Sequence, residues 1–146
     1  MRDLERQAEQ LSMLHYEHLK ELSLLAANIA GQGEDGVLLC LYVAGRTMLS
    51  GDIVDKTGLT TGRVANILRQ LEGKRLIRRF QDAADRRRVH VSLTPEGFAR
   101  AEALNAEANL AHQKLLAYLG ERDSAELIRI MQRCFAYSRE NLLPDR

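Results

Sequence analysis

The chain has 146 residues, of which 45% are hydrophobic and 28% charged, with two prolines and no tryptophan. This composition is that of an ordinary, helix-rich globular protein of one domain, and it excludes a disordered chain. No apolar run reaches the roughly 18 residues of a membrane span, and the polar start MRDLERQAEQ is unlike a signal peptide, so we expect a cytoplasmic protein without a membrane partner.

Charge is distributed unevenly along the chain. Residues 56–100 contain eleven Lys and Arg against four Asp and Glu, a net charge of +7. The rest of the chain contains ten against sixteen, a net of −6, so the two parts give the formal charge of +1. A basic block within an otherwise acidic chain is typical of a surface that binds phosphates, and the competing interpretation is a solvated charged surface.

Two helices are predicted before the basic block. Residues 3–30 are expected to form one long helix with an apolar seam, and Gly31 and Gly33 to stop it. The seam positions are spaced alternately by four and three residues: Leu4, Ala8, Leu11, His15, His18, Leu22, Leu25 and Ile29. A second helix, about residues 34–44, has no polar face and ends at Gly45, so we predict that it lies in the core.

A helix-turn-helix is predicted next. Ser50 is a candidate N-cap for a helix over residues 51–57, and Gly58 is placed to end it in the left-handed conformation. Thr60 is then expected to cap a helix from about residue 61 to 74. The apolar positions of this helix face inward: Val64, Ile67, Leu68 and Leu71. Its outward face and flanks are small or polar: Gly62, Arg63, Ala65, Asn66, Arg69 and Gln70.

An arginine-tipped hairpin follows. Residues 76–80 and 89–93 carry strand-type side chains, and the loop between them, about residues 81–88, contains Arg86, Arg87 and Arg88. A helix followed by such a hairpin is the shape of a winged helix-turn-helix, which places a helix in the DNA major groove and a wing over the minor groove. The sequence carries no constellation of an enzyme and no cofactor or metal motif, so we expect none of these.

The C-terminal part is predicted to be helical and to serve dimerisation. Thr94 and Pro95 open a helix that runs to Gly120, and Asp123 to Glu126 resembles the start of a last helix. Apolar stripes at both ends of the chain are most simply buried in a homodimer, with the basic unit at each outer end. A two-fold dimer would read two DNA half-sites about one turn apart.

The motifs of this region resemble the MarR family of bacterial transcriptional regulators over essentially the whole chain. Asp85-Arg86-Arg87 through Leu93-Thr94 to Gly97 is similar to the D-x-R-x5-L-T-x-x-G wing signature, and Thr57-Gly58-Leu59, Leu71-Glu72 and Leu76-Ile77 resemble the helix-turn-helix frame. The resemblance implies a mainly α fold with a minor β part. It also implies one domain over residues 1–146, with a DNA-binding lobe at about 34–94 and dimerisation helices at about 3–30 and 95–143.

Site residues follow from the same resemblance. Arg87 would enter the minor groove and Asp85 would hold the wing. Recognition-helix positions that face phosphates or bases correspond to Thr60, Thr61, Gly62, Arg63 and Asn66. Arg69, Arg86 and Arg88 are further candidates for DNA contact. The family usually has glycine at position 75, so Arg75 either adopts the left-handed conformation, at a cost of roughly 1–2 kcal/mol, or ends the helix differently and adds a phosphate contact.

The resemblance also implies a homodimeric repressor of a near-palindromic operator in double-stranded DNA, and a small-molecule effector. His15 and His18 occupy seam positions where leucine packs better. They belong either to a ligand pocket, a pH response or a metal site, or to a pair satisfied by hydrogen bonds. Pocket companions would be Tyr16, Tyr42, Arg46 and Met48. Cys40 and Cys134 are expected to be reduced, buried thiols. The competing function is a winged-helix module for protein–protein contact.

Overall fold

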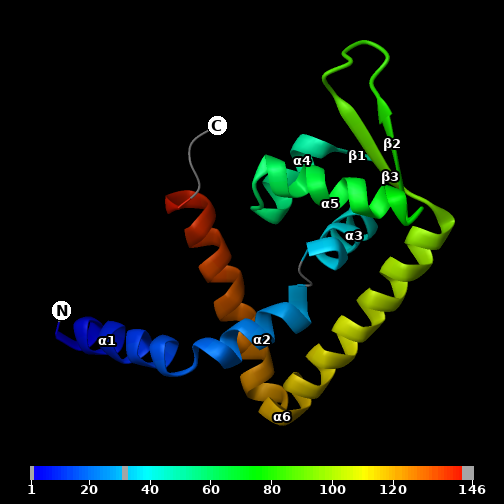
Figure 1. Ribbon diagram of the computed structural model, residues 1–146. Helices are drawn as coiled ribbons and strands as arrows, with labels where there is room; N and C mark the ends of the chain where they lie inside the picture. Colours follow the sequence, from blue (N-terminus) through cyan, green and yellow to red (C-terminus); the bar gives the residue numbers. More distant parts are fainter. Residues whose placement is uncertain (1, 31–32, 143–146) are drawn as a thin grey trace. The chain divides into compact units, whose positions relative to one another are not determined.

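The computed structural model describes residues 2–30 and 33–142, and Figure 1 shows its elements. The elements in chain order are α1 (Arg2–Glu17), α2 (Leu19–Ala30), α3 (Gly33–Ala44), β1 (Met48–Leu49), α4 (Ser50–Thr57), α5 (Thr61–Gly73), β2 (Ile77–Gln81), β3 (Val89–Leu93) and α6 (Pro95–Asn141). The chain divides into two compact units, Met1–Ala108 and Asn109–Arg146, which are described separately below. No helix within the described ranges is long and apolar enough to cross a membrane.

One hydrophobic core holds α3, α4, α5, the sheet and the start of α6 together. We call this part, residues 33–104, the winged-helix lobe. Its buried apolar residues are Val37, Leu38, Leu41, Met48, Ile53, Val64, Ile67, Leu68, Leu71, Ile77, Val91, Ala101 and Leu104. The four inward positions predicted for the recognition helix are all among them. The prediction that α3 is central is also confirmed, although Val43 on its other side is 77% exposed.

The ends of α4 and α5 are set by two residues with different roles. Gly58 has φ 67° and ends α4 in the left-handed conformation, as predicted. Thr60 accepts a hydrogen bond from the Arg63 amide at 3.2 Å and so caps α5. The prediction that Ser50 caps α4 is wrong. Ser50 is already helical, because β1 passes directly into the helix and Leu49 occupies the cap position without a side-chain hydrogen bond.

The junction from α5 to β2 is a Schellman turn with arginine where glycine is usual. The Leu76 amide donates to the Leu71 carbonyl at 3.0 Å and the Arg75 amide to the Glu72 carbonyl at 2.9 Å. Arg75 has φ 60°, the one non-glycine residue with positive φ in the described chain. Of the two alternatives left open by the sequence, the strained left-handed Arg75 is therefore the one observed.

Two signature residues after β3 lock this turn to α6. The Thr94 hydroxyl donates to the Arg75 carbonyl at 2.7 Å and accepts from the Gly97 amide at 3.0 Å. A Cβ at Gly97 would lie 1.8 Å from the Leu76 carbonyl oxygen, so no side chain fits there. The L-T-x-x-G part of the wing signature is thus explained by packing against the α5–β2 turn, with Thr94 capping α6 as predicted.

The sheet is antiparallel, with strand order β1-β3-β2. Both predicted strands are confirmed to within one residue, and Ile77 pairs with Leu93 while Phe80 pairs with His90. The two-residue strand β1 was not predicted. It pairs Met48 with Val91 and Leu49 with His90, and two residues are too few to show an alternating pattern in the sequence.

The N-terminal segment forms two helices and not the single predicted one. The break falls at His18, between α1 and α2. It lies where His15 and His18 interrupt the predicted apolar seam. The apolar side chains described on both helices are exposed, including Leu11 at 57% and Leu25 at 43%. The side chain of Ile29 and all of Gly31 lie outside the described residues.

Helix α6 is interrupted at Gly120, where φ is 81° and ψ 170°, so the predicted stop at this glycine is confirmed. The expected capping box at Asp123 is absent from the hydrogen bonds described there. Instead Glu126 binds Arg129, and Ser124 donates to the Leu116 carbonyl at 2.9 Å. Cys134 is exposed, contrary to the prediction of a buried thiol.

Candidate nucleic-acid interface

The solvent face of α5 presents a polar, sterically open surface. Thr60, Thr61, Gly62, Arg63 and Arg69 are exposed, and Asn66 is half-buried. Nothing would contact a Cβ at Gly62 within 4 Å. Arg69 Nη1 lies 3.5 Å from Asn66 Oδ1, one turn along the helix. Thr60 accepts the hydrogen bond of the Arg63 amide, which fixes the first turn of α5. The guanidinium of Arg63 remains in solvent.

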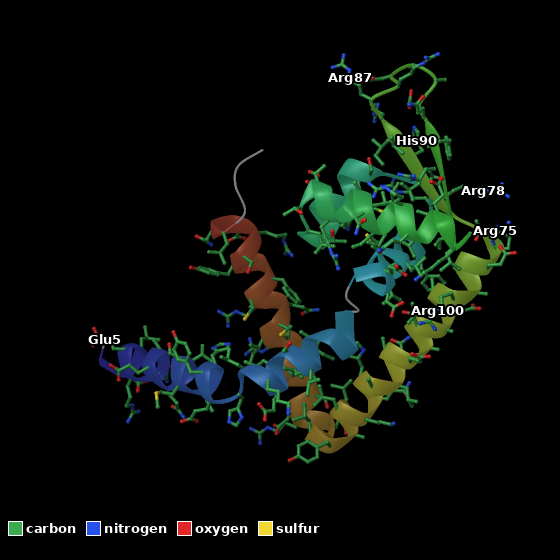
Figure 2. The ribbon with its side chains drawn as sticks, viewed as in Figure 1. Glu5, Arg75, Arg78, Arg87, His90 and Arg100 are labelled. Carbon is green, nitrogen blue, oxygen red and sulfur yellow. The ribbon has the colours of Figure 1, made fainter. Side chains whose placement is uncertain are left out.

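The wing loop, residues 82–88, is shaped by backbone hydrogen bonds to carboxylates. Asp85 Oδ1 accepts from the Arg87 amide at 3.0 Å, and the Asp85 carbonyl accepts from the Arg88 amide at 2.9 Å. The Arg87 side chain is 96% exposed at the tip of the hairpin (Figure 2). Arg86 and Arg88 are also exposed. Asp85 is therefore in a position to shape the turn from which Arg87 projects.

A groove of about 590 Å³ lies between the recognition helix and the wing. At the start of α4 it is lined by Leu49, Ser50, Gly51, Asp52, Val54 and Asp55, and on α5 by Thr61, Val64, Ala65 and Leu68. Arg79, Arg87, Arg88 and Val89 of the hairpin complete the lining. The fold thus brings the N-terminal half of α5 and the wing arginines to one concave surface. Both α5 and the wing loop belong to the basic block of residues 56–100, so the sequence had already predicted that they form one surface.

Arg75 is not part of this groove. It lies at the C-terminal end of α5, about 18 Å along the helix axis from Arg63 at 1.5 Å per residue. In Figure 2, Arg75 and Arg78 lie near the base of the hairpin, and Arg87 lies at its tip. The predicted phosphate contact of Arg75 would therefore need DNA that extends past the groove.

Three members of the basic block form ion pairs that hold the lobe together. Lys74 pairs with Glu34 of α3, and Arg100 of α6 pairs with Asp35. Arg79 donates from Nε to Glu72 Oε2 at 2.9 Å, and these guanidinium hydrogen bonds keep the pKa of Glu72 below its usual range. Within the described residues, Arg63, Arg86 and Arg88 make no ion pair. These three residues of the wing loop and α5 are thus exposed cations outside the ion pairs that hold the lobe together.

Sequence reasoning missed two residues at the stem of the wing, Asp82 and His90. His90 Nε2 lies 2.8 Å from Asp82 Oδ2, and the imidazole stacks on Phe80 at 5.1 Å between ring centroids. The hydrogen bond from His90, followed by those from the Ala84 and Asp85 amides, lowers the pKa of Asp82 to about 2. The available signal was the position of His90 opposite Phe80 in the hairpin register, with an Asp just beyond the strand.

The candidate ligand residues are dispersed among different environments. Met48 is buried in the lobe core with its sulfur 4.0 Å from Cys40 Sγ, and burial raises the pKa of the Cys40 thiol. The rings of Tyr42 and Phe98 are tilted by 51° with their centroids 5.2 Å apart, and Arg46 is exposed. His15, Tyr16 and His18 are exposed at the end of α1 and at the break after it.

The histidines have local partners. His15 Nδ1 donates to the Leu11 carbonyl at 3.0 Å, and His18 lies 3.9 Å from Glu21. Among the described side chains, no group of three or more His, Cys, Asp or Glu is placed to hold a metal ion. The alternative of histidines satisfied by hydrogen bonds is thus supported for His15.

The helix-turn-helix and the wing have counterparts in known proteins. Residues 36–89, which include the helix-turn-helix and most of the wing, match the sequence model of the MarR family. Comparison with curated proteins gives no significant match. Several solved structures share the fold.

The Staphylococcus aureus MepR–DNA complex is 24% identical, with a TM-score of 0.69 over 83% of this chain and 95% of MepR. MepR in its DNA-binding conformation is 25% identical, with a TM-score of 0.62 over 89% and 96%. Bordetella bronchiseptica BpsR, whose DNA binding is regulated by 6-hydroxynicotinic acid, is 21% identical, with a TM-score of 0.68 over 86% and 98%. The matched segment holds α5 and most of the wing, so residues 36–89 are similar to the MarR family, and the fold of this chain is that of these winged-helix structures.

Proposed function

We propose that the protein is a sequence-specific, homodimeric transcriptional repressor in the cytoplasm, binding a near-palindromic operator in double-stranded DNA and responding to a small-molecule effector. The observation that carries the DNA-binding part is the exposed basic surface formed by Arg63 and Arg69 on α5 and by Arg86, Arg87 and Arg88 on the wing loop. A surface with this charge and shape suits a duplex whose major groove receives the helix and whose minor groove receives the wing.

The residues fit distinct roles in reading DNA. Arg63 can donate to guanine O6 and N7 together, and Asn66 can bind adenine N6 and N7. Arg87, fully in solvent, can enter a narrow minor groove, where negative potential is concentrated. Thr60, Thr61 and Arg69 suit phosphate or sugar contacts, as do Arg86 and Arg88. Asp85 supports Arg87 through the turn, and Gly62 leaves room for close approach.

The dimer is supported by the apolar side chains exposed outside the lobe. On α1 and α2 these include Leu4, Leu11, Met13, Leu14, Leu19, Leu22, Leu24 and Leu25, and in the second unit Ile128, Ile130, Met131 and Phe135. Exposed apolar surface on this scale is typical of an interface between subunits. Sedimentation equilibrium should give twice the monomer mass of 16.5 kDa. A monomeric mass at micromolar concentration would rule out this arrangement.

DNA binding is tested with a fluorescent fragment containing the protein's own promoter. Anisotropy is measured across a salt series, with and without competitor DNA. Binding should survive competitor and weaken steeply with salt, since phosphate contacts release counterions. Binding abolished by competitor would contradict sequence specificity for this fragment. No binding at low salt would favour the protein-interaction module.

Arg87→Ala is the decisive variant. It should weaken binding by about 1–3 kcal/mol, because the minor-groove contact is lost. Arg122→Ala is the matched control, since it removes the same charge from the second unit, outside the lobe. Equal affinity of the Arg87→Ala and Arg122→Ala proteins would remove the wing from the interface.

The proposed effector is tested separately. Compounds would be screened for release of the bound fragment, starting with aromatic acids because Tyr42 and Arg46 offer a ring and a cation. A metal- or pH-responsive regulator acting through His15 and His18 is the alternative. It predicts that zinc or mild acid changes DNA affinity in the wild type but not in a His15→Leu, His18→Leu protein.

A further inference from the structure

The stem of the wing contains a compact set of contacts that the DNA-reading residues do not explain. Phe80 and His90 are cross-strand partners at the end of the hairpin, and their rings stack nearly parallel, 11° apart. On its other side His90 reaches Asp82, the first residue of the wing loop, at 2.8 Å. The His90 side chain is 27% exposed and that of Asp82 22%, so water is partly excluded from the contact.

Asp82 connects the His90 side chain to the backbone of the wing loop. While Oδ2 faces His90, Oδ1 accepts from the amides of Ala84 at 2.8 Å and Asp85 at 3.2 Å. The Asp82 amide also donates to the Arg88 carbonyl at 2.9 Å, which closes the loop across its base. A short path of hydrogen bonds therefore leads from His90 through Asp82 to Asp85, whose carboxylate holds the Arg87 amide.

The ionised carboxylate of Asp82 determines that a nitrogen of His90 carries the shared hydrogen. The pKa of Asp82 is about 2, so it is ionised and can only accept hydrogen bonds. His90 Nε2 must then carry the hydrogen, and both the neutral Nε2–H tautomer and the imidazolium satisfy this. The contact thus persists whichever charge His90 carries. It is a fixed structural element and does not need a pH change to form.

We propose that His90 is the positioning residue of the wing: through its hydrogen bond to Asp82 and its stacking on Phe80, it holds residues 82–88 in the conformation that presents Arg87 to the minor groove. This inference rests on the proposed function, because it concerns how the wing meets DNA. Three consecutive arginines repel one another, and a loop that carries them needs such a restraint. A preordered loop gains affinity because its ordering entropy is not lost on binding.

The test is a double-mutant cycle. His90→Phe keeps a ring beside Phe80 but removes the donor to Asp82, and Arg87→Ala removes the reading side chain. On the promoter fragment, His90→Phe should weaken binding roughly three- to tenfold, by loss of preorganisation. In the Arg87→Ala background the same change should have little further effect, because the two residues act as one unit. Ser92→Ala, on the same strand two residues away, is the control.

Hydrogen exchange of the free protein gives a readout independent of DNA. Amides of residues 82–88 should exchange faster in His90→Phe than in the wild type, and remain unchanged in Arg87→Ala and Ser92→Ala. His90→Gln, which restores a donor, should recover part of both the protection and the affinity. Circular dichroism confirms that each variant is folded.

The outcomes separate the two proposals. If Arg87→Ala binds like the wild type, the wing contact of the proposed function fails, while exchange still reports on His90. If Arg87→Ala weakens binding but His90→Phe weakens it equally in both backgrounds, His90 acts elsewhere and the inference is overturned. Unchanged exchange of the wing loop in His90→Phe would overturn it as well.

Discussion

Arg75 occupies a backbone conformation that favours glycine, and this gives a stability prediction whose size follows from the structure. At φ 60° an L side chain costs about 1–2 kcal/mol, which glycine does not incur. Glycine also increases the conformational entropy of the unfolded chain, which offsets about 0.4–1 kcal/mol. The Arg75→Gly protein should therefore be more stable than the wild type by about 1 kcal/mol.

The measurement is urea unfolding at one fixed protein concentration, because subunit association would otherwise shift the midpoint. In thermal unfolding, the expected gain in the free energy of unfolding corresponds to a rise in Tm of roughly 3 °C for a chain of this size. Arg75→Ala is the matched control. It removes the guanidinium but keeps a Cβ at the same φ, so no gain is expected from it.

A glycine variant no more stable than the alanine variant would contradict backbone strain at Arg75. That result would mean that the Schellman turn tolerates a side chain at position 75 without strain. The same two proteins also test the phosphate contact predicted for Arg75. If the guanidinium binds DNA, both should lose affinity equally, with the salt slope reduced by about one.

Further substitutions and pH test other parts of the fold. Gly97→Ala should lower the free energy of unfolding by about 3 kcal/mol or more, because its Cβ would overlap the Leu76 carbonyl, and urea unfolding measures this. Thr60→Ala should cost about 1 kcal/mol in the same assay, since the Arg63 amide loses its acceptor, and Thr60→Ser should restore most of it. The pKa of Asp82 is lower in the folded protein, about 2, than its ordinary 3.8, so its contribution to stability is complete above about pH 4 and is lost as pH falls toward 2. The Asp82→Asn protein should lack this loss of stability when its acid unfolding is measured. An acid-unfolding curve identical to that of the wild type would contradict the role given to Asp82.

Local sequence signals were sufficient for α5, the end of α4 and the hairpin of the lobe. The turn glycine at 58, the cap at Thr60 and the 3–4 spacing of Val64 to Leu71 each act within a few residues, and each was confirmed. The hairpin could be predicted for the same reason, since alternating side chains and a polar loop identify it locally. Ser50 was misassigned because the competing strand β1 forms only through its pairing with β3, more than 40 residues away.

The parts that sequence did not reveal depend on contacts between distant residues. The two-sided hydrogen bonding of Thr94 and the exclusion of a Cβ at Gly97 exist only when the α5–β2 turn is in place. Asp82 and His90 carried no recognisable motif, because their pairing follows from the hairpin register. The break at His18 was not predicted either, because a heptad pattern with two polar members does not mark where a helix divides.

The order of the sheet has a consequence for how copies of this chain associate. Within the described chain β2 has β3 on one side and an open edge on the other. Open strand edges template aggregation by pairing with a second strand, and charged side chains suppress this. Arg78 lies midway along that strand with its side chain exposed, next to Arg79, which is paired with Glu72. Edge-to-edge pairing of two copies about a two-fold axis would bring like charges together, so the hairpin can project far into solvent without becoming a seed for β-aggregates.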